Sequence, residues 1–288
     1  MSDVRWQSDE LDLDAYLRRI GLDPDGGAAP DVGTLRAVMA GHVASIPFEN
    51  AEVLLGRPVL LDVPALERKM VRQPRGGYCY EQNLLFAAAL ERLGFDVTGL
   101  GARIRMGSDK ILATTHMLLR VDLDGAPWHV DVGFGGEALL EPLPLAAGVE
   151  VTQGAWTFSV VEEGDEGDGV RLLRGLHADG WFPLYAYNLE PRYRPDYEVW
   201  NHYIATHPRS PFVRRLVVQQ PGREQRVALV GDTLTTIGPG GETAKRTVAP
   251  EELPAVLGEF GLAFSAEDLD VLIARAAAQR DEDTEESR

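Results

Sequence analysis

Cysteine is almost missing from this chain, because Cys79 is the only cysteine among its 288 residues. A single cysteine excludes an intramolecular disulfide framework, a thioredoxin-like cysteine pair and a zinc site built mainly from thiolates. We therefore expect no bound metal, and any cysteine chemistry must depend on Cys79 alone.

Positive charge is also scarce, since 28 Lys and Arg residues face 45 Asp and Glu residues, a formal net charge of −17. This charge repels phosphodiester backbones and anionic membrane surfaces, so we expect no binding to nucleic acid or to membranes. No stretch approaches the roughly 18 consecutive apolar residues of a transmembrane helix. The acidic opening segment does not resemble a signal peptide, and we expect a cytoplasmic protein.

Apolar residues nevertheless make up 44% of the chain, which is enough for a large buried core. Helical periodicity dominates residues 1–95, and strand-like segments separated by turn-forming residues dominate residues 96–200. Residues 201–280 mix strands with helices, including a final helix expected to end at Ala278, and the acidic residues 281–288 are expected to be disordered. The predicted fold class is therefore α+β, with a central antiparallel sheet or small barrel.

The segment around Cys79, residues 75–94 (RGGYCYEQNLLFAAALERLG), places this cysteine where its thiol can be activated. Gly76 and Gly77 allow a tight turn, and apolar residues then recur at helical spacing until Gly94. At a helix N-terminus, unpaired N–H groups and the helix dipole favour the nucleophilic thiolate. The alternative interpretation is an inert, packed cysteine.

A cysteine nucleophile needs a base, and the base needs an orienting group. His116 and Asp131 lie in two neighbouring expected strands, which a two-residue turn at Asp124–Gly125 would join into a hairpin. Leu118 then faces Asp131, so His116 and Asp131 share one face as a diagonal pair. His129 shares that face, and spacing alone leaves it open as the base.

The glycine-rich run at residues 133–136 (GFGG) could approach a phosphate closely through its backbone. As a nucleotide-binding signal it is weak, because it lacks the Lys-Ser/Thr pair of a P-loop and opens no clear helix. The more common role of such a run is to let the chain turn past a neighbour.

Taken together, four motifs resemble, in order, the signature of the arylamine N-acetyltransferases. They are residues 45–50 (SIPFEN), residues 75–83 (RGGYCYEQN), Thr115–His116 and residues 131–135 (DVGFG). The resemblance is strongest over residues 1–140.

The resemblance implies a three-part fold, with a helical bundle at residues 1–95, a β-barrel at 96–200 and an α/β lid at 201–280. It implies a catalytic triad of Cys79, His116 and Asp131, drawn from the first two parts, and selects His116 over His129. By the same likeness Phe134 would line the substrate pocket, and Arg19 would pair with Glu49 beneath the triad helix. Coenzyme contacts would come from Thr115, Gly133 and Gly135.

The implied reaction uses acetyl-CoA as co-substrate and passes an acetyl group through the cysteine to an arylamine, arylhydrazine or hydrazide. Such acceptors are uncharged at neutral pH, whereas an aliphatic amine is mostly protonated and cannot attack. An amide synthase that transfers a larger acyl group in a natural-product pathway remains an alternative, and a cysteine amidohydrolase is a further one. We expect a monomer or a homodimer.

Overall fold

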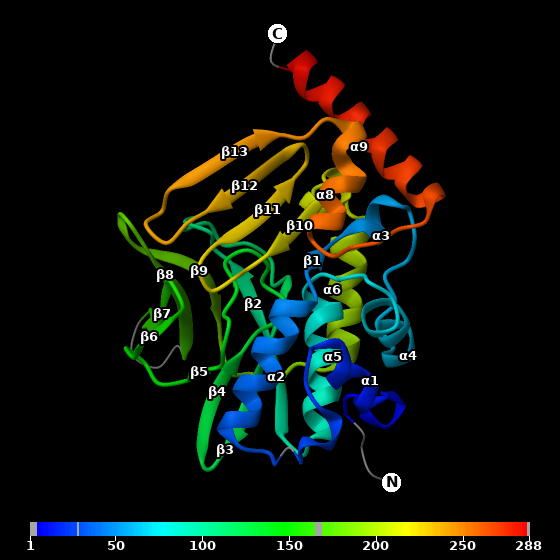
Figure 1. Cartoon of the computed structure of the whole chain (residues 1–288). Coiled ribbons are helices and arrows are strands. Elements are labelled where there is room, and N and C mark those ends of the chain that lie inside the picture. Colours follow the sequence, from blue (N-terminus) through cyan, green and yellow to red (C-terminus); the bar gives the residue numbers. More distant parts are fainter. Residues whose placement is uncertain (1–4, 28, 165–168, 287–288) are drawn as a thin grey trace.

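The computed structural model describes residues 5–27, 29–164 and 169–286, with the side chains of the last helix described up to residue 280. The chain begins with helices, continues into a curled antiparallel sheet and ends with a second sheet covered by two helices (Figure 1). The N-terminal elements are η1 (Ser8–Glu10), α1 (Leu13–Arg19), η2 (Pro24–Gly26), α2 (Val32–Ser45), α3 (Ala51–Leu54), α4 (Val63–Leu66), the π-helical turn η3 (Glu67–Val71) and α5 (Cys79–Arg92).

Local sequence accounts for where several of these helices begin and end. The carboxylate of Asp31 accepts a hydrogen bond from the Thr34 N–H at 2.8 Å, which makes Asp31 the N-cap of α2. Helix α2 stops at Ser45. Pro47 explains this end, because a residue that precedes proline avoids the helical conformation and Ile46 is extended.

The central part of the described chain forms an eight-stranded antiparallel sheet that curls into a nearly closed barrel. Its spatial order is β5-β4-β3-β2-β9-β8-β7-β6. The strands are β2 (Asp96–Ile104), β3 (His116–Leu123), β4 (Ala126–Val130), β5 (Leu143–Pro144), β6 (Glu150–Gln153), β7 (Trp156–Glu163), β8 (Val170–His177) and β9 (Gly180–Tyr187).

The predicted hairpin between β3 and β4 is confirmed. Asp124 and Gly125 form its two-residue turn with φ angles of 52° and 77°, as a primed turn requires. Leu119 pairs with Val130, which is the predicted register. Asp131 lies just beyond the end of β4 rather than within the strand.

A five-stranded antiparallel sheet follows in the described C-terminal part, in the order β1-β10-β11-β12-β13. Its first strand comes from far away in the sequence, because β1 (Phe48–Glu49) pairs with β10. The remaining elements are α6 (Arg194–Thr206), α7 (Pro211–Arg214), β10 (Val217–Gln220), β11 (Arg226–Val230), β12 (Thr233–Ile237), β13 (Thr243–Thr247), η4 (Pro250–Glu252), α8 (Leu253–Glu259) and α9 (Ala266–Glu286).

Two features of this part differ from the sequence-based expectation. The boundary placed between residues 200 and 201 falls inside α6. Helix α9 does not end at Ala278 but continues to Glu286, so residues 281–286 of the supposed disordered tail are helical. No glycine or proline follows Gly261 in the sequence, so nothing interrupts the helix. Residues 287–288 lie outside the described part.

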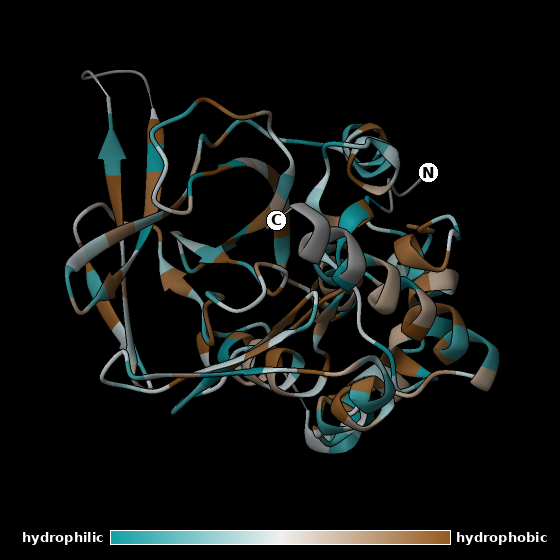
Figure 2. Cartoon of the chain, turned by 90° about the horizontal axis from the view of Figure 1, so that it is seen from above, coloured by the Kyte–Doolittle hydropathy of each residue, from teal (hydrophilic) through white to brown (hydrophobic). Residues whose placement is uncertain are grey.

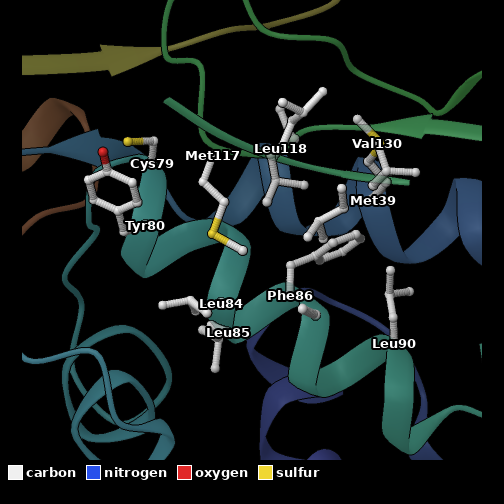
Figure 3. Packing of buried hydrophobic residues seen from close by; sticks show 14 of the residues in the cluster. Met39, Cys79, Tyr80, Leu84, Leu85, Phe86, Leu90, Met117, Leu118 and Val130 are labelled. Carbon is white, nitrogen blue, oxygen red and sulfur yellow. The ribbon is translucent and has the colours of Figure 1, made fainter. Parts of the chain in front are cut away.

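One apolar core joins the N-terminal helices to the eight-stranded sheet. In Figure 3, Phe86 and Leu90 of α5 lie with Met39 of α2 and with Leu118 and Val130 of the β3–β4 hairpin. A second cluster lies between the five-stranded sheet and helices α3, α8 and α9. Seen from above in Figure 2, brown apolar segments alternate with teal polar ones along the helices and strands, as expected of elements that bury one face.

Helix α5 is buried along most of its length, since every residue from 79 to 90 is buried. The polar Gln82 is therefore buried as well, and its amide N–H donates to the Pro47 carbonyl at 2.9 Å. Without such partners a buried amide would cost folding free energy. These bonds fix the start of α5 against the segment before α3. Among the described residues, none of the helices combines the length and apolarity needed to cross a membrane.

Candidate active site

Cys79 is the first residue of α5, where the sequence analysis expected it. The carboxylate of Glu81 accepts the Tyr78 N–H at 3.0 Å and so closes the first turn of the helix. The side chain of Cys79 is 95% buried, and its Sγ lies 4.0 Å from the Thr115 carbonyl oxygen. Figure 3 shows Cys79 at this end of the helix, with Tyr80 beside it.

His116 begins β3, and its ring is buried between this helix end and the β3–β4 hairpin. Its Nε2 donates to Oδ2 of Asp131 at 2.6 Å. Burial lowers the pKa of His116, but the charge of Asp131 and hydrogen bonds with Asp131 and Cys79 raise it, with a net pKa of about 10. An imidazolium at this position is therefore stable at neutral pH.

Asp131 is fully buried, and hydrogen bonds reach both of its carboxylate oxygens. Oδ1 accepts from Asn83 Nδ2 at 3.1 Å and from the Gly133 N–H at 2.9 Å. Oδ2 accepts from His116 and from the Tyr185 hydroxyl at 2.8 Å. Burial alone would raise the pKa of Asp131, but His116, Asn83 and the Gly133 N–H hold it below its ordinary value, so the carboxylate is ionised.

The structure distinguishes His129 from His116. Nδ1 and Nε2 of His129 each lie 2.7 Å from a tyrosine hydroxyl, those of Tyr187 and Tyr185. Burial lowers the pKa of His129 to about 4, so this imidazole is neutral at physiological pH. Both nitrogens of His129 thus have a tyrosine hydroxyl as partner, whereas Asp131 contacts His116 through Nε2 and not through Nδ1.

A cavity of about 560 Å³ opens beside Cys79 and His116. This size is in the range of small-molecule sites, roughly 300–1,000 Å³. The walls come from both sheets and from the helices between them. They are largely apolar and include Phe48, Ile104, Phe134, Ile204, Phe212 and Val217. Thr115 and Gly133 also line the cavity, as does Glu137 beside its partner Arg226.

Gly133 and Gly135 allow close packing of the backbone beside the site. A Cβ on Gly133 would lie 2.7 Å from Cys79 Cα, so only glycine lets this loop pass Cys79 so closely. Gly135 has a φ of +85°, and a Cβ there would lie 2.0 Å from Gln219 Oε1. Both glycines hold the hairpin end against its neighbours.

The comparisons with known proteins identify the family. A family model described as N-acetyltransferase matches residues 31–269. An arylamine N-acetyltransferase of Mycolicibacterium smegmatis is 41% identical over 259 residues, which cover 88% of this chain and 92% of that protein. The chain belongs to the arylamine N-acetyltransferase family. It is therefore related to enzymes that transfer acyl groups.

Solved arylamine N-acetyltransferases also share this fold. The crystal structure of the Nocardia farcinica protein superposes with a TM-score of 0.89 at 44% identity and covers 95% of this chain and 98% of its own. The Mycobacterium marinum protein, solved in complex with CoA, gives a TM-score of 0.82 at 31% identity over 94% of this chain and 99% of its own. The resemblance seen in the motifs thus extends over nearly the whole chain.

One residue contact expected from the family resemblance is wrong. Glu49 does not pair with Arg19 but accepts from Arg75 NH2 at 2.7 Å and lies 3.6 Å from Lys69 Nζ. Arg19 Nε instead donates to the Met70 carbonyl at 3.0 Å. The π-helical turn η3, which carries Lys69 and Met70, explains this arrangement because it supplies both the cation for Glu49 and the acceptor for Arg19.

Several residues of the site were not predicted from the sequence. Asn83 lies four residues after Cys79, which puts both on one face of a helix, and this spacing could have identified it. Tyr185 lies in an expected strand, but nothing in the sequence connects it with Asp131. The residues of α6, α7 and β10 that line the cavity also have no local sequence pattern that would place them there. Within the described ranges, no group of three or more His, Cys, Asp or Glu side chains is arranged to hold a metal ion.

Proposed function

We propose that this protein transfers an acetyl group from acetyl-CoA to arylamines, arylhydrazines or hydrazides through an acetyl-Cys79 intermediate. The observation that carries the proposal is that Cys79 and His116 line one apolar cavity and that His116 is hydrogen-bonded to the buried Asp131. The same order of nucleophile, base and orienting acid serves acyl transfer on unrelated folds. The CoA complex of the M. marinum relative supports the choice of donor.

In the first step the proton of the Cys79 thiol moves to Nδ1 of His116. The resulting thiolate attacks the thioester carbonyl of acetyl-CoA, and the CoA thiolate leaves after the tetrahedral intermediate collapses. His116 then returns the proton to the leaving sulfur. One thioester replaces another, so this step is nearly balanced in free energy. Asp131 stays ionised and holds the imidazolium through Nε2.

In the second step a neutral amine attacks the carbonyl of acetyl-Cys79. His116 accepts a proton from the attacking nitrogen, and the C–S bond breaks to release the amide and the Cys79 thiolate. Proton transfer of this kind contributes typically about 10²–10⁴ in rate. The step runs downhill because an amide is more stable than a thioester.

The cavity supports an aromatic acceptor. Phe134 packs edge-on against His116 with 5.2 Å between ring centroids, so an aryl group beside Phe134 would lie next to the general base. Burial in apolar surroundings also disfavours a protonated aliphatic amine. An arylamine or hydrazine avoids this cost because it enters the site uncharged.

We further infer a division of labour along the chain. Residues 1–95 supply the nucleophile, residues 96–200 supply the base and the orienting acid, and residues 201–280 act as a lid over the cavity. The lid role is supported by Val217, Gln219 and Ala228, which bring the five-stranded sheet to the cavity wall. Gln219 also accepts the Gly136 N–H at 3.0 Å, which joins this sheet to the loop after Asp131.

Intact-mass spectrometry after mixing with acetyl-CoA tests the proposal. We expect the mass of one acetyl group on the wild-type chain, its absence in Cys79→Ala, and its loss when an arylamine or hydrazine is added. Cys79 is the only cysteine, so no other thiol can carry the label. An acetyl adduct that persists in Cys79→Ala would contradict the mechanism.

A longer acyl thioester distinguishes the amide-synthase alternative. The proposal predicts that acetyl-CoA loads the enzyme at least as fast as a bulkier donor. Loading by the bulky donor only, with none from acetyl-CoA, would show that the acyl group is not acetyl.

A further inference from the structure

The hydrogen bonds at Asp131 continue into the interior of the barrel beyond His116. The Tyr185 hydroxyl donates to Asp131 Oδ2 at 2.8 Å and lies 2.7 Å from His129 Nε2. His129 Nδ1 in turn lies 2.7 Å from the Tyr187 hydroxyl. Tyr185 and His129 are fully buried, and Tyr187 is 97% buried. A tyrosine–histidine–tyrosine chain therefore ends on the carboxylate that orients the base.

The direction of every proton in this chain follows from Asp131. An ionised carboxylate can only accept, so the Tyr185 hydroxyl must donate to it. The oxygen of Tyr185 then accepts from Nε2–H of His129. Because His129 is neutral, its Nδ1 carries no proton and accepts from the Tyr187 hydroxyl. Each donor thus points toward Asp131.

The charged neighbours of His129 fit this assignment. Asp131 lies two residues further along, just beyond the end of β4, and His116 lies on β3. Arg120, which pairs with His129 across β3, is held by Asp122 at 2.7 Å. On the β9 side, Tyr187 pairs with Arg171 of β8. None of these contacts replaces either tyrosine as a partner of the imidazole.

A second buried chain in the protein has the same chemistry but a different end. The Tyr16 hydroxyl lies 2.8 Å from His42 Nδ1, and His42 Nε2 lies 2.6 Å from Gln82 Oε1. The Gln82 amide N–H groups donate to backbone carbonyls, so its Oε1 is the acceptor and His42 has the same tautomer as His129. Burial lowers the pKa of His42 to about 4 as well. This second chain ends on backbone carbonyls, whereas the first ends on Asp131. It therefore provides a matched control.

We propose that His129 and Tyr187 are positioning residues that act through Tyr185 to keep Asp131 aligned with His116. Without the Tyr187 donor, His129 can move its proton to Nδ1. Its bare Nε2 then competes with Asp131 for the single Tyr185 proton. Asp131 would lose a donor and the fixed orientation of Oδ2 on which the His116 hydrogen bond depends. The consequence for catalysis rests on the proposed function, whereas the consequence for the His116 proton does not.

The experiment compares Tyr187→Phe with Tyr16→Phe in the full chain. Each change removes one hydroxyl from Nδ1 of a buried neutral histidine, so both should lower the melting temperature similarly. We expect Tyr187→Phe and His129→Leu to slow acetylation of Cys79 by about tenfold, with little change in the KM for acetyl-CoA. Tyr16→Phe should leave the rate unchanged. His129→Gln should recover most of the loss, because its amide N–H can still donate to Tyr185.

Proton NMR of the histidine-labelled protein provides a readout that does not need acetyl-CoA. The His116 Nε2 proton should resonate far downfield, and its shift should change in Tyr187→Phe but not in Tyr16→Phe. Equal effects of the two tyrosine changes on rate and resonance, or no effect of either, would overturn the inference. If the wild type takes up no acetyl group, the proposed function fails, and the NMR comparison still decides whether this chain positions Asp131.

Discussion

Two groups of buried charges flank the start of α5, and they neutralise carboxylates in different ways. In the first group, which we call the ion cluster, Glu49 and Glu81 lie against Lys69 and Arg75. In the second, Asp131 lies against His116 beside Cys79. Glu49 and Asp131 are both fully buried, and the pKa of each is lowered by its cation despite the opposing effect of burial.

The difference lies in whether the cation can give up its proton. Lys69 and Arg75 keep theirs, since nearby carboxylates raise the pKa of both above values that are already high, although burial opposes this. Their charges hold the turn before Cys79 in place, and the cluster has a structural role. In the proposed mechanism His116 exchanges its proton with Cys79, so there the same electrostatic arrangement would serve proton transfer.

The largest expected effect comes from removing the charge in the second group. We expect Asp131→Asn to slow acetylation of Cys79 by about 10⁴-fold, because an amide neither stabilises the imidazolium nor fixes its tautomer. Single-turnover mass spectrometry with acetyl-CoA measures the rate. Glu49→Gln is the matched control, since it removes one buried charge from the ion cluster. A similar loss of rate per folded molecule in Glu49→Gln would erase the distinction between the two groups.

The ion cluster should instead determine stability. We expect Glu49→Gln to lower the free energy of unfolding by about 3 kcal/mol, because Lys69 and Arg75 lose a buried counter-charge. The loss should be at the lower end for a buried pair, since Glu81 and Glu52 still contact these cations at 2.7 and 2.9 Å. Urea unfolding followed by circular dichroism measures it. A change below about 1 kcal/mol would show that the pair is no better than an exposed one.

Local sequence predicted the parts of the site that depend on neighbours in the chain. The turn residues Asp124 and Gly125 require the two-residue hairpin, and this turn alone sets the register that brings His116 to Asp131. The glycines before Cys79 and the apolar spacing after it were likewise enough to place the start of α5. These features need only a few residues each.

Contacts between distant segments could not be predicted in this way. The pairing of β1 with β10 joins residues about 170 positions apart, and no local pattern specifies it. The prediction that Glu49 pairs with Arg19 was wrong for the same reason, because the partner of Glu49 depends on how η3 packs beneath α5. Strand β13 has no apolar pattern that would predict a strand, because its sequence, TAKRT, is polar and exposed, which is typical of a protected sheet edge.

The pH dependence of stability should separate the two groups next. In a Cys79→Ala background, where no thiol titrates and the contribution of Cys79 is absent, Asp131 still keeps the folded-state pKa of His116 raised above 6.5. This stabilisation is complete below the unfolded pKa of 6.5 and is lost as the pH rises toward the folded value. In this background, the free energy of unfolding with His116 should exceed that of the matching His116→Gln variant. This difference should fall by roughly 1 kcal/mol per pH unit from about pH 7 to 9.

The Glu49–Lys69 pair of the ion cluster should show no such slope. The pKa of Glu49 lies below 4.5 and that of Lys69 above 10.5, so neither titrates between about pH 7 and 9. The loss of unfolding free energy in Glu49→Gln should therefore stay constant across that pH range. Denaturant unfolding at several pH values checks both curves, and a flat His116 curve would mean that His116 is neutral in the folded protein.

The smallest effect tests where the ion cluster ends. Arg19 donates to the Met70 carbonyl and lies outside the cluster, and burial lowers its pKa rather than an anion raising it. Arg19→Met keeps the apolar stem and removes only this hydrogen bond, so unfolding should become easier by about 1 kcal/mol. The double variant with Glu49→Gln should show additive losses in urea unfolding, because the two side chains share no partner. Strong coupling between them would instead place Arg19 among the cations that neutralise Glu49.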